Sequence, residues 1–304
     1  MFMPFERRNE REMKRVGIVT DSHSGITQKQ AKEMGVFVLP MPFCIDGRNY
    51  LEGVTLTRED FLHRLTEGAD VSTSQPSPLD VTNIWNRALA EYEEIVYIPI
   101  SSGLSGSCMV ATVLSGEKSY KNRVFVVDNG RVSTPMRRSV MDAIEMRQEG
   151  YHAAQIKQML EAAKAQMQIY VAVDTLEYLR KGGRISGAAA AIGTLMNIKP
   201  VLKFDIGSLD TYKKCRGFVQ AKRAMIEAMR RDLETLYAEQ LSRGEVYLLS
   251  ASSASAQVTD AWVKEIEAAF PGMEVLSDNL TLGICCHIGP NGLGIGCSCR
   301  PRRI

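Results

Sequence analysis

Three basic side chains crowd around a glycine pair in the middle of the chain. Arg180, Lys181 and Arg184 flank Gly182 and Gly183, between an apolar segment and an alanine-rich one. Because like charges repel one another, such a cluster favours a site at which something anionic docks. The same residues also suit a helix C-terminus, where cations offset the helix dipole and glycine adopts the left-handed cap conformation. The spacing alone leaves both interpretations open.

Two hydroxyl-rich segments could bind a polar group. The segment 101–107, Ser-Ser-Gly-Leu-Ser-Gly-Ser, follows the apolar run 95–100 and precedes a predicted helix. Hydroxyls and free N–H groups at a helix start can bind an anion, although N-capping is the commoner role of serine. The segment lacks the Gly-Lys-Ser ending of a nucleotide-binding loop. In the second segment, Thr73 and Ser74 stand shortly before two prolines that stiffen the loop.

His287 and four cysteines lie near the end of the chain. A lone histidine at the end of a predicted strand is more often structural than functional. Two of the cysteines, Cys285 and Cys286, are adjacent and would point to opposite faces of a strand. Cys297 and Cys299 would share a face and could chelate a metal or form a redox pair, but clear thiolate-ligand spacing is missing. We expect no metal, and small apolar core residues followed by a C-terminal tail.

Short apolar runs alternate with helix-like segments along the whole chain. We predict strands at 16–20, 36–39, 95–100, 124–128, 169–173, 245–250 and 274–276. Helices are predicted at 27–35, 57–65, 77–92, 137–148, 153–166 and 218–241, with one more after the serine-rich segment. This alternation predicts an α/β protein with two domains, each with a largely parallel sheet flanked by helices. The expected ranges are 1–14 for a flexible N-terminal extension, 15–160 for the first domain and 161–304 for the second.

Composition excludes several classes of protein. The chain has 304 residues, 45% of them hydrophobic and 24% charged, and a net charge of +2. These values are typical of a soluble globular protein and argue against a general nucleic-acid binder. The N-terminus has no apolar stretch long enough for a signal peptide, and no run reaches the roughly 18 apolar residues of a membrane span. We therefore expect a cytoplasmic protein with reduced thiols and without stable membrane insertion.

Five segments, in order, resemble the DegV family of bacterial fatty-acid-binding proteins. The resemblance extends from about residue 16 to about residue 296 and rests on 20–22, 73–78, 101–107, a signature at 174–186 that continues at 193–202, and 287–290. It implies a protein that binds one long-chain fatty acid between two domains and needs no other cofactor. It also implies that the carboxylate is presented to a separate ATP-dependent fatty acid kinase, which forms an acyl phosphate for phospholipid metabolism. The chain would then be a lipid-binding subunit rather than an enzyme in itself.

The resemblance also assigns roles to individual residues. The head group would be held by Thr73, Ser74, Ser102, Ser105, Gly106 and His287, and the kinase would face Arg180, Lys181 and Arg184. Small side chains at 186–193 would allow close helix packing or leave room for the acyl chain. Asn291 and the segments 107–109 and 133–135 depart from the family's usual residues, which bears on chain-length selectivity.

Two alternatives remain open at this point. One is a stand-alone enzyme that uses His287 as base or nucleophile on a small carbonyl or acyl substrate, with Ser105 nearby. No acidic residue is obviously placed to orient that histidine. The other is a thiol or metal protein that uses the four C-terminal cysteines.

Overall fold

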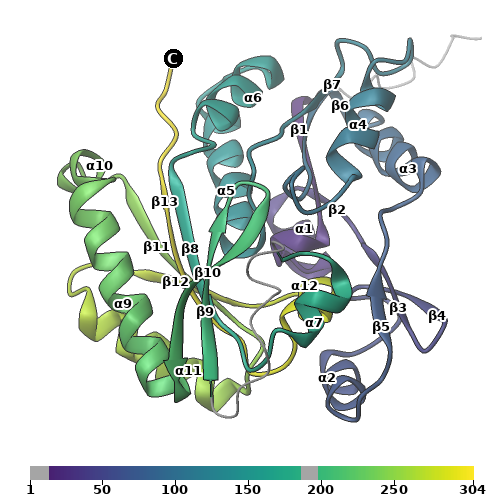
Figure 1. Ribbon diagram of the computed structural model, residues 1–304. Coiled ribbons are helices and arrows are strands. Elements are labelled where there is room, and N and C mark those ends of the chain that lie inside the picture. The colour runs from purple at the N-terminus through teal and green to yellow at the C-terminus, as the bar shows by residue number, and fades with distance from the viewer. Residues whose placement is uncertain (1–13, 186–197) are drawn as a thin grey trace, which may run out of the picture.

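A parallel sheet forms the first half of the protein. The computed structural model describes residues 14–185 and 198–304, and Figure 1 shows helices packed around its sheets. The first sheet has the order β2-β1-β6-β7 with all neighbours parallel. Its strands are β2 (Phe37–Leu39), β1 (Lys14–Asp21), β6 (Tyr92–Ile98) and β7 (Val124–Val126). Six consecutive residues of β1 are buried, as expected for a strand with both faces covered.

The second half is built on a six-stranded sheet that is mostly antiparallel. Its order is β10-β9-β8-β13-β11-β12, and only the pair β11–β12 is parallel. The strands are β8 (Met167–Ala172), β9 (Ile198–Asp205), β10 (Ser208–Arg216), β11 (Val246–Ser252), β12 (Val275–Asn279) and β13 (Leu293–Cys299). The expectation of a largely parallel sheet is therefore wrong for this half. Two features account for this: β9 and β10 form a hairpin that runs antiparallel alongside β8, and β13 returns antiparallel between β8 and β11.

A third, three-stranded antiparallel sheet was not predicted. It has the order β4-β3-β5, with strands β3 (Pro42–Ile45), β4 (Arg48–Leu51) and β5 (Val71–Thr73). Asp46 and Gly47 form the two-residue turn between β3 and β4, and both have positive φ. An Asp-Gly pair between extended runs is a strong hairpin signal, because this turn matches the twist of the strands. The last strand of this sheet delivers Thr73 to the site described below.

Three helices begin at the capping residues that the sequence indicates. Thr27, Thr57 and Ser77 each accept a hydrogen bond from a backbone N–H in the first turn, and Pro78 follows as the first helical residue. The predicted helix 218–241 is interrupted after 235. The helices, with one short 3-10 turn, are η1 (Ser22–Ser24), α1 (Gln28–Met34), α2 (Arg58–Thr66), α3 (Pro78–Leu89), α4 (Ser107–Ser115), α5 (Ser133–Gln148), α6 (Ala153–Ala162), α7 (Glu177–Gly182), α9 (Gly217–Thr235), α10 (Ala238–Ser242), α11 (Ala256–Ala269) and α12 (Leu282–Ile288).

The C-terminal segment corrects two expectations. His287, Cys285 and Cys286 lie on helix α12 and not at the end of a strand. A distant residue stabilises this helix, because the Glu52 carboxylate accepts hydrogen bonds from the N–H groups of Leu282 and Gly283. The residues expected to begin a tail, Cys297 and Cys299, belong to β13, where both are buried in the core of the second half.

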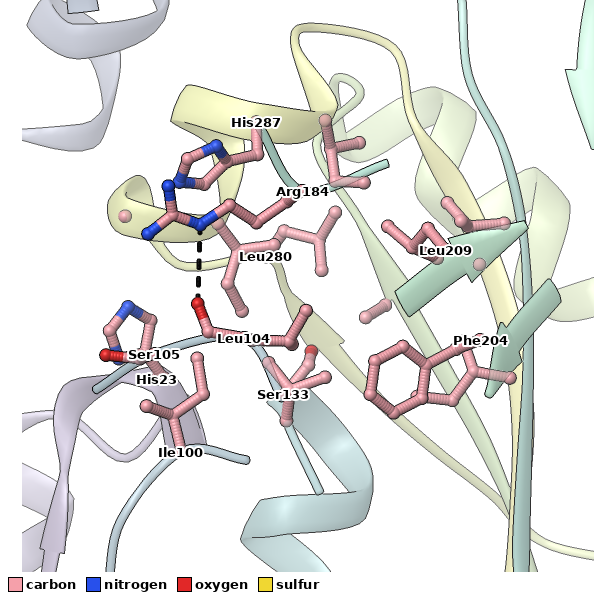
Figure 2. A pocket seen from close by; sticks show the side chains of 18 of the residues that line it. His23, Ile100, Leu104, Ser105, Ser133, Arg184, Phe204, Leu209, Leu280 and His287 are labelled. Carbon is pink, nitrogen blue, oxygen red and sulfur yellow. Dashed lines mark hydrogen bonds between the residues drawn. The ribbon is translucent and has the colours of Figure 1, made fainter. Parts of the chain in front are cut away.

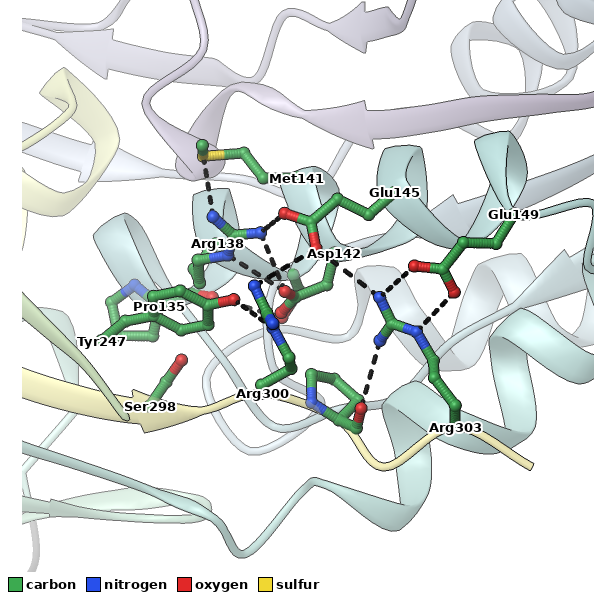
Figure 3. Close-up of polar contacts among 12 residues, drawn as sticks. Pro135, Arg138, Met141, Asp142, Glu145, Glu149, Tyr247, Ser298, Arg300 and Arg303 are labelled. Carbon is green, nitrogen blue, oxygen red and sulfur yellow. Dashed lines mark hydrogen bonds and ion pairs between the residues drawn. The ribbon is translucent and has the colours of Figure 1, made fainter. Parts of the chain in front are cut away.

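An ion network fastens the C-terminal residues to α5. Arg138 pairs with Asp142, with a distance of 2.9 Å between Nη2 and Oδ1, and also with Glu145. From the chain end, Arg303 donates to Glu149 through Nε at 2.7 Å (Figure 3). One hydrophobic cluster contains buried side chains from both halves, for example Ile100 and Phe204. The long helix α5 contacts strands of both halves, β1 and β6 in the first and β11, β12 and β13 in the second.

The domain ranges stay a prediction. The first sheet ends with β7 and the second begins with β8, on either side of residues 160 and 161. The proposed extension, apart from Lys14 in β1, and the alanine-rich segment 186–193 lie outside the described residues. Among the helices of the described part, none combines the length and the apolar character needed to cross a bilayer.

Candidate functional site

A cavity of about 130 Å³ lies where the three sheets meet. This is roughly ten times the space that one buried water needs. The lining residues come from both halves of the chain: among others, from the ends of β5 and β6, the start of α5, strands β8, β9, β10, β11 and β13, and α12. Ser74 and Gln75 line the cavity and are exposed, so it reaches the surface beside them. Such a position resembles the usual location of ligand sites at strand ends between domains.

One end of the cavity is polar. The Nε2 atom of His287 lies 2.9 Å from the hydroxyl oxygen of Thr73, which joins α12 to β5. Ser105 also lines the cavity, and its hydroxyl is 2.8 Å from that of Ser107 at the start of α4. Figure 2 shows Arg184 beside His287, with its Nε donating to the carbonyl oxygen of Leu104 at 3.3 Å. Hydroxyl, imidazole and guanidinium groups therefore converge on one place.

The rest of the lining is mostly apolar. It contains side chains from β8, β9, β10 and α12, together with the loop after β6. Representative residues are Ile100, Ile169, Val171, Phe204, Leu209 and Ile288. A cavity with a cluster of polar groups at one end and mostly hydrocarbon walls elsewhere suits an amphiphilic ligand with one acidic group.

His287 is held in an uncharged state. Burial lowers its pKa to about 4, and the positive charges of Arg184 and His23 act in the same direction. Its Nδ1 atom has no hydrogen-bond partner among the described residues. The ring packs against the backbone of Gly182, where an added Cβ atom would lie 2.0 Å from Nδ1. The site therefore needs a glycine next to the histidine, as well as the histidine itself.

The titration of His287 provides a first prediction. In the protein without a bound ligand the ring should stay neutral between about pH 7 and pH 5, because its pKa lies near 4 instead of the ordinary 6.5. A carboxylate bound beside Nε2 would stabilise the imidazolium, so an acidic ligand should raise this pKa and its binding should take up a proton in that range. Nitrogen-15 NMR of labelled histidine checks this, with His287→Ala to assign the signal. A ring that already titrates near pH 6.5 without ligand would contradict it.

His23 is a cavity residue that the sequence analysis missed. Its Nδ1 atom lies 3.0 Å from the Asp21 carboxylate, which also accepts a hydrogen bond from the N–H of Ile100 at 2.8 Å. Burial lowers the pKa of His23, but Asp21 and Glu52 outweigh that effect, so the pKa lies above its ordinary value. The sequence does hold a signal next to His23, because the preceding segment 20–22 is one of those that carry the family resemblance. That this segment lies close to the cavity is visible only in the fold.

The structure brings together five of the predicted site residues. Thr73, Ser74, Ser105, Arg184 and His287 all line the cavity. Their roles stay predictions. The five residues come from four segments that are far apart in the sequence, so the fold is what brings them together.

The remaining predicted residues lie elsewhere. Ser102 is exposed and donates to Asp128 at 2.8 Å, and Gly106 faces the side chain of Gln75. Arg180 is half-buried on α7 and is not among the cavity residues, while exposed Lys181 pairs with Asp70.

Both interpretations of the basic cluster have a structural counterpart. Helix α7 ends here, and Gly183 adopts the left-handed cap conformation with φ of 65°. Arg180 and Lys181 occupy the last helical turn, where cations oppose the helix dipole. Arg184, just beyond the cap, turns to the cavity instead. The cluster is thus a helix terminus from which one cation reaches the site.

The alternatives that use thiols or a catalytic histidine gain no support. Within 14–185 and 198–304, no group of three or more His, Cys, Asp or Glu side chains is arranged to hold a metal ion. Burial raises the pKa of Cys285 to about 12 and that of Cys299 to about 11, so neither is a ready thiolate. In the same described residues, no carboxylate hydrogen-bonds to His287, which leaves it without the orienting partner of a hydrolytic triad.

Comparisons with known proteins show the family to which the chain belongs. The family model for the DegV family of uncharacterised proteins matches residues 15–299. A DegV domain-containing protein from Caldanaerobacter subterraneus subsp. tengcongensis is 30% identical over 287 residues, or 93% of this chain and 98% of that protein. A solved DegV family structure from Thermus thermophilus, described by its fatty acid binding, has a TM-score of 0.83 at 30% identity. It covers 94% of this chain and 99% of its own.

More distant structures share the fold. A stearic acid-binding protein from Eubacterium ventriosum has a TM-score of 0.82 at 21% identity, with 94% of this chain and 98% of that chain covered. The expected α/β fold is confirmed by these superpositions, with the correction to the second sheet given above. Because the family model matches nearly the whole chain and relatives at 30% identity cover more than nine-tenths of it, this chain belongs to the DegV family.

Proposed function

We propose that this protein binds one long-chain fatty acid in the cavity and presents its carboxylate to a separate ATP-dependent kinase. The observation that carries this proposal is the polar end of a mostly apolar cavity, where Thr73 and His287 meet at 2.9 Å. The similarity to the Thermus thermophilus fatty-acid-binding structure supports it, at 30% identity over almost the whole chain.

The carboxylate belongs at the polar end for electrostatic reasons. A buried carboxylate is stable only with charged or hydrogen-bonding partners. Thr73, Ser105 and His287 supply hydrogen-bonding groups, and Arg184 supplies a positive charge that does not titrate. The hydrocarbon chain then extends along the apolar walls, where each buried methylene contributes about 0.8 kcal/mol. Ser74 and the neighbouring loops with Ser102 and Gly106 would shape the mouth through which the head group is reached.

Phosphoryl transfer would be completed by the partner. The serine-rich segment 101–107 lacks the Gly-Lys-Ser ending of a nucleotide-binding loop, so ATP would be held by the kinase. Arg180 and Lys181 would dock that kinase or neutralise the charge that develops on the phosphate. The protein would act in the cytoplasm as a lipid-binding subunit in phospholipid metabolism, without catalysing the transfer alone.

Co-purifying lipid is the direct test. Protein made in bacterial cells and extracted with organic solvent should yield about one long-chain fatty acid per chain, because the apolar walls would otherwise be exposed to water. Mass spectrometry of the extract identifies the acid. Delipidated protein should then bind oleate or palmitate with the same stoichiometry.

The negative outcome is equally clear. If purified protein carries no fatty acid and also stays empty after incubation with oleate and palmitate, the proposed function is wrong. Hydrolysis of acyl esters by the pure protein, with loss of that activity in His287→Ala, would instead support the stand-alone enzyme.

A further inference from the structure

Helix α5 begins inside the cavity without the partners that a helix start needs. Val132, Ser133, Thr134 and Pro135 are buried, and the residue before the helix, Val132, has no side chain able to cap it. The N–H groups of Ser133 and Thr134 have no hydrogen-bond acceptor among the described residues. Buried helix starts are normally satisfied by a cap, by water or by a ligand. This one is the start of a 16-residue helix, so its dipole is fully developed.

Two hydroxyl groups at the same place are also unpartnered. Ser133 is 7% exposed and Thr134 is 3% exposed, and both line the cavity. Neither hydroxyl makes a hydrogen bond to any described residue. Further along the same helix, the hydroxyl of Ser139 accepts a hydrogen bond from Asn129 at 2.8 Å and donates one to the carbonyl of Pro135 at 3.2 Å. The contrast indicates that Ser133 and Thr134 are directed at something that enters the cavity.

The surroundings of these groups favour a neutral oxygen over a charged one. Figure 2 shows Ser133 between Leu104 and Phe204, apart from Arg184 and His287. Of the lining residues with positive charge or a titratable ring, Arg184 and His287 belong to the polar end, and the ring of His23 is paired with the Asp21 carboxylate. A buried carboxylate needs such partners, whereas a hydroxyl or keto oxygen needs only hydrogen bonds. Two N–H donors and two hydroxyls supply those bonds.

We propose that the start of α5 is a second polar subsite in the cavity, which binds a hydroxyl or keto oxygen carried on the hydrocarbon chain of an oxygenated fatty acid. This inference rests on the proposed function, because it assumes that the carboxylate occupies the end with Thr73 and His287. It adds a substrate class: chains with an oxygen beyond the head group are bound in preference to plain saturated chains of equal length.

The test compares acids that differ by one oxygen. Delipidated protein is titrated with stearate and with 3-, 10- and 12-hydroxystearate by calorimetry. At least one hydroxy acid should bind about fivefold or more tightly than stearate, as expected for a gained hydrogen bond to otherwise unsatisfied groups. The position of the preferred hydroxyl reports the distance between the two polar sites along the chain.

A double variant, Ser133→Ala with Thr134→Val, removes both hydroxyls and keeps the side-chain volumes. Alanine is chosen because Ser133 has φ of 57°, and glycine would change the backbone as well. The ratio of hydroxystearate affinity to stearate affinity should fall to about one in this variant. Thr259→Val is the matched control, since Thr259 is a buried helical threonine whose hydroxyl bonds to Ser255 at 3.0 Å, away from the cavity. It should leave the ratio unchanged.

The outcomes separate the two proposals. If stearate binds but no hydroxy acid binds more tightly, the subsite holds water alone and this inference is wrong. If the double variant loses stearate affinity while His287→Ala does not, the carboxylate itself lies at α5 and the inference is also overturned. If no acid binds at all, the proposed function fails and the subsite fails with it. Circular dichroism melting of each variant confirms that the fold is retained.

Discussion

Replacing His287 by alanine should weaken fatty-acid binding about tenfold or more, because hydrogen bonds to charged groups contribute roughly 1.5–3 kcal/mol. The imidazole is fixed by the 2.9 Å contact with Thr73 and lies beside Arg184, so its loss removes a partner from the carboxylate that water cannot easily replace. Titration of delipidated protein with oleate measures the effect. His63→Ala is the matched control: that histidine is exposed, pairs with Glu67 on α2, and lies outside the cavity. If the two variants bind oleate with equal affinity, His287 has only a structural role.

The same prediction can be tested without removing the imidazole. In Gly182→Ala the new methyl group would lie 2.0 Å from Nδ1 of His287, so the ring must move away from its present position. Gly182 has no positive φ, and alanine is therefore tolerated by the backbone itself. Affinity should fall as in His287→Ala. Gly116→Ala, at the end of α4 with its nearest neighbour at 3.3 Å, adds a methyl group elsewhere and should leave binding intact.

The sequence predicted those helices and strands that interactions between near neighbours in the chain stabilise. Thr27, Thr57 and Ser77 each cap a helix by accepting a hydrogen bond from the backbone N–H three residues later. Both partners therefore stand close together in the sequence, where the pattern is visible. The parallel strands of the first half are continuous apolar runs for a similar reason, since helices cover both faces. Thr73, Ser105 and His287 were found from the family resemblance, and the structure places all three on the cavity.

Long-range contacts explain what the sequence analysis missed. Helix α12 depends on Glu52, which is 230 residues away from Leu282 in the chain, so Cys285 and His287 resemble a strand when only their neighbours are considered. The position of β13 between β8 and β11 is likewise a property of the whole sheet. His23 reaches the cavity only because β1 ends beside α12, where an added Cβ atom on Gly283 would lie 2.9 Å from Nε2 of the histidine. Burial and pairing across the fold cannot be inferred from spacing.

The basic cluster supports a prediction that separates binding from phosphoryl transfer. Arg184 lines the cavity, whereas Arg180 is half-buried on α7 and is not a cavity residue. We therefore expect Arg184→Ala to weaken fatty-acid binding, because it removes the fixed positive charge at the polar end. Arg180→Ala should leave the affinity nearly unchanged. With the cognate kinase at saturating lipid, it should reduce acyl-phosphate formation roughly a hundredfold, the usual effect of losing one donor to a developing charge.

Two further variants make the test specific to the guanidinium group. Arg180→Lys should recover little activity, because an ammonium group lacks the planar pair of donors that matches a phosphate. Arg87→Ala removes an exposed arginine from α3, outside the cavity, and should change neither measurement. Lipid titration of the isolated protein and kinase turnover at saturating lipid are measured for every variant. Loss of lipid affinity in Arg180→Ala, with normal turnover per bound lipid, would place Arg180 in the lipid site. Unchanged values in both would leave it as a cation that stabilises the end of α7, where its charge opposes the helix dipole.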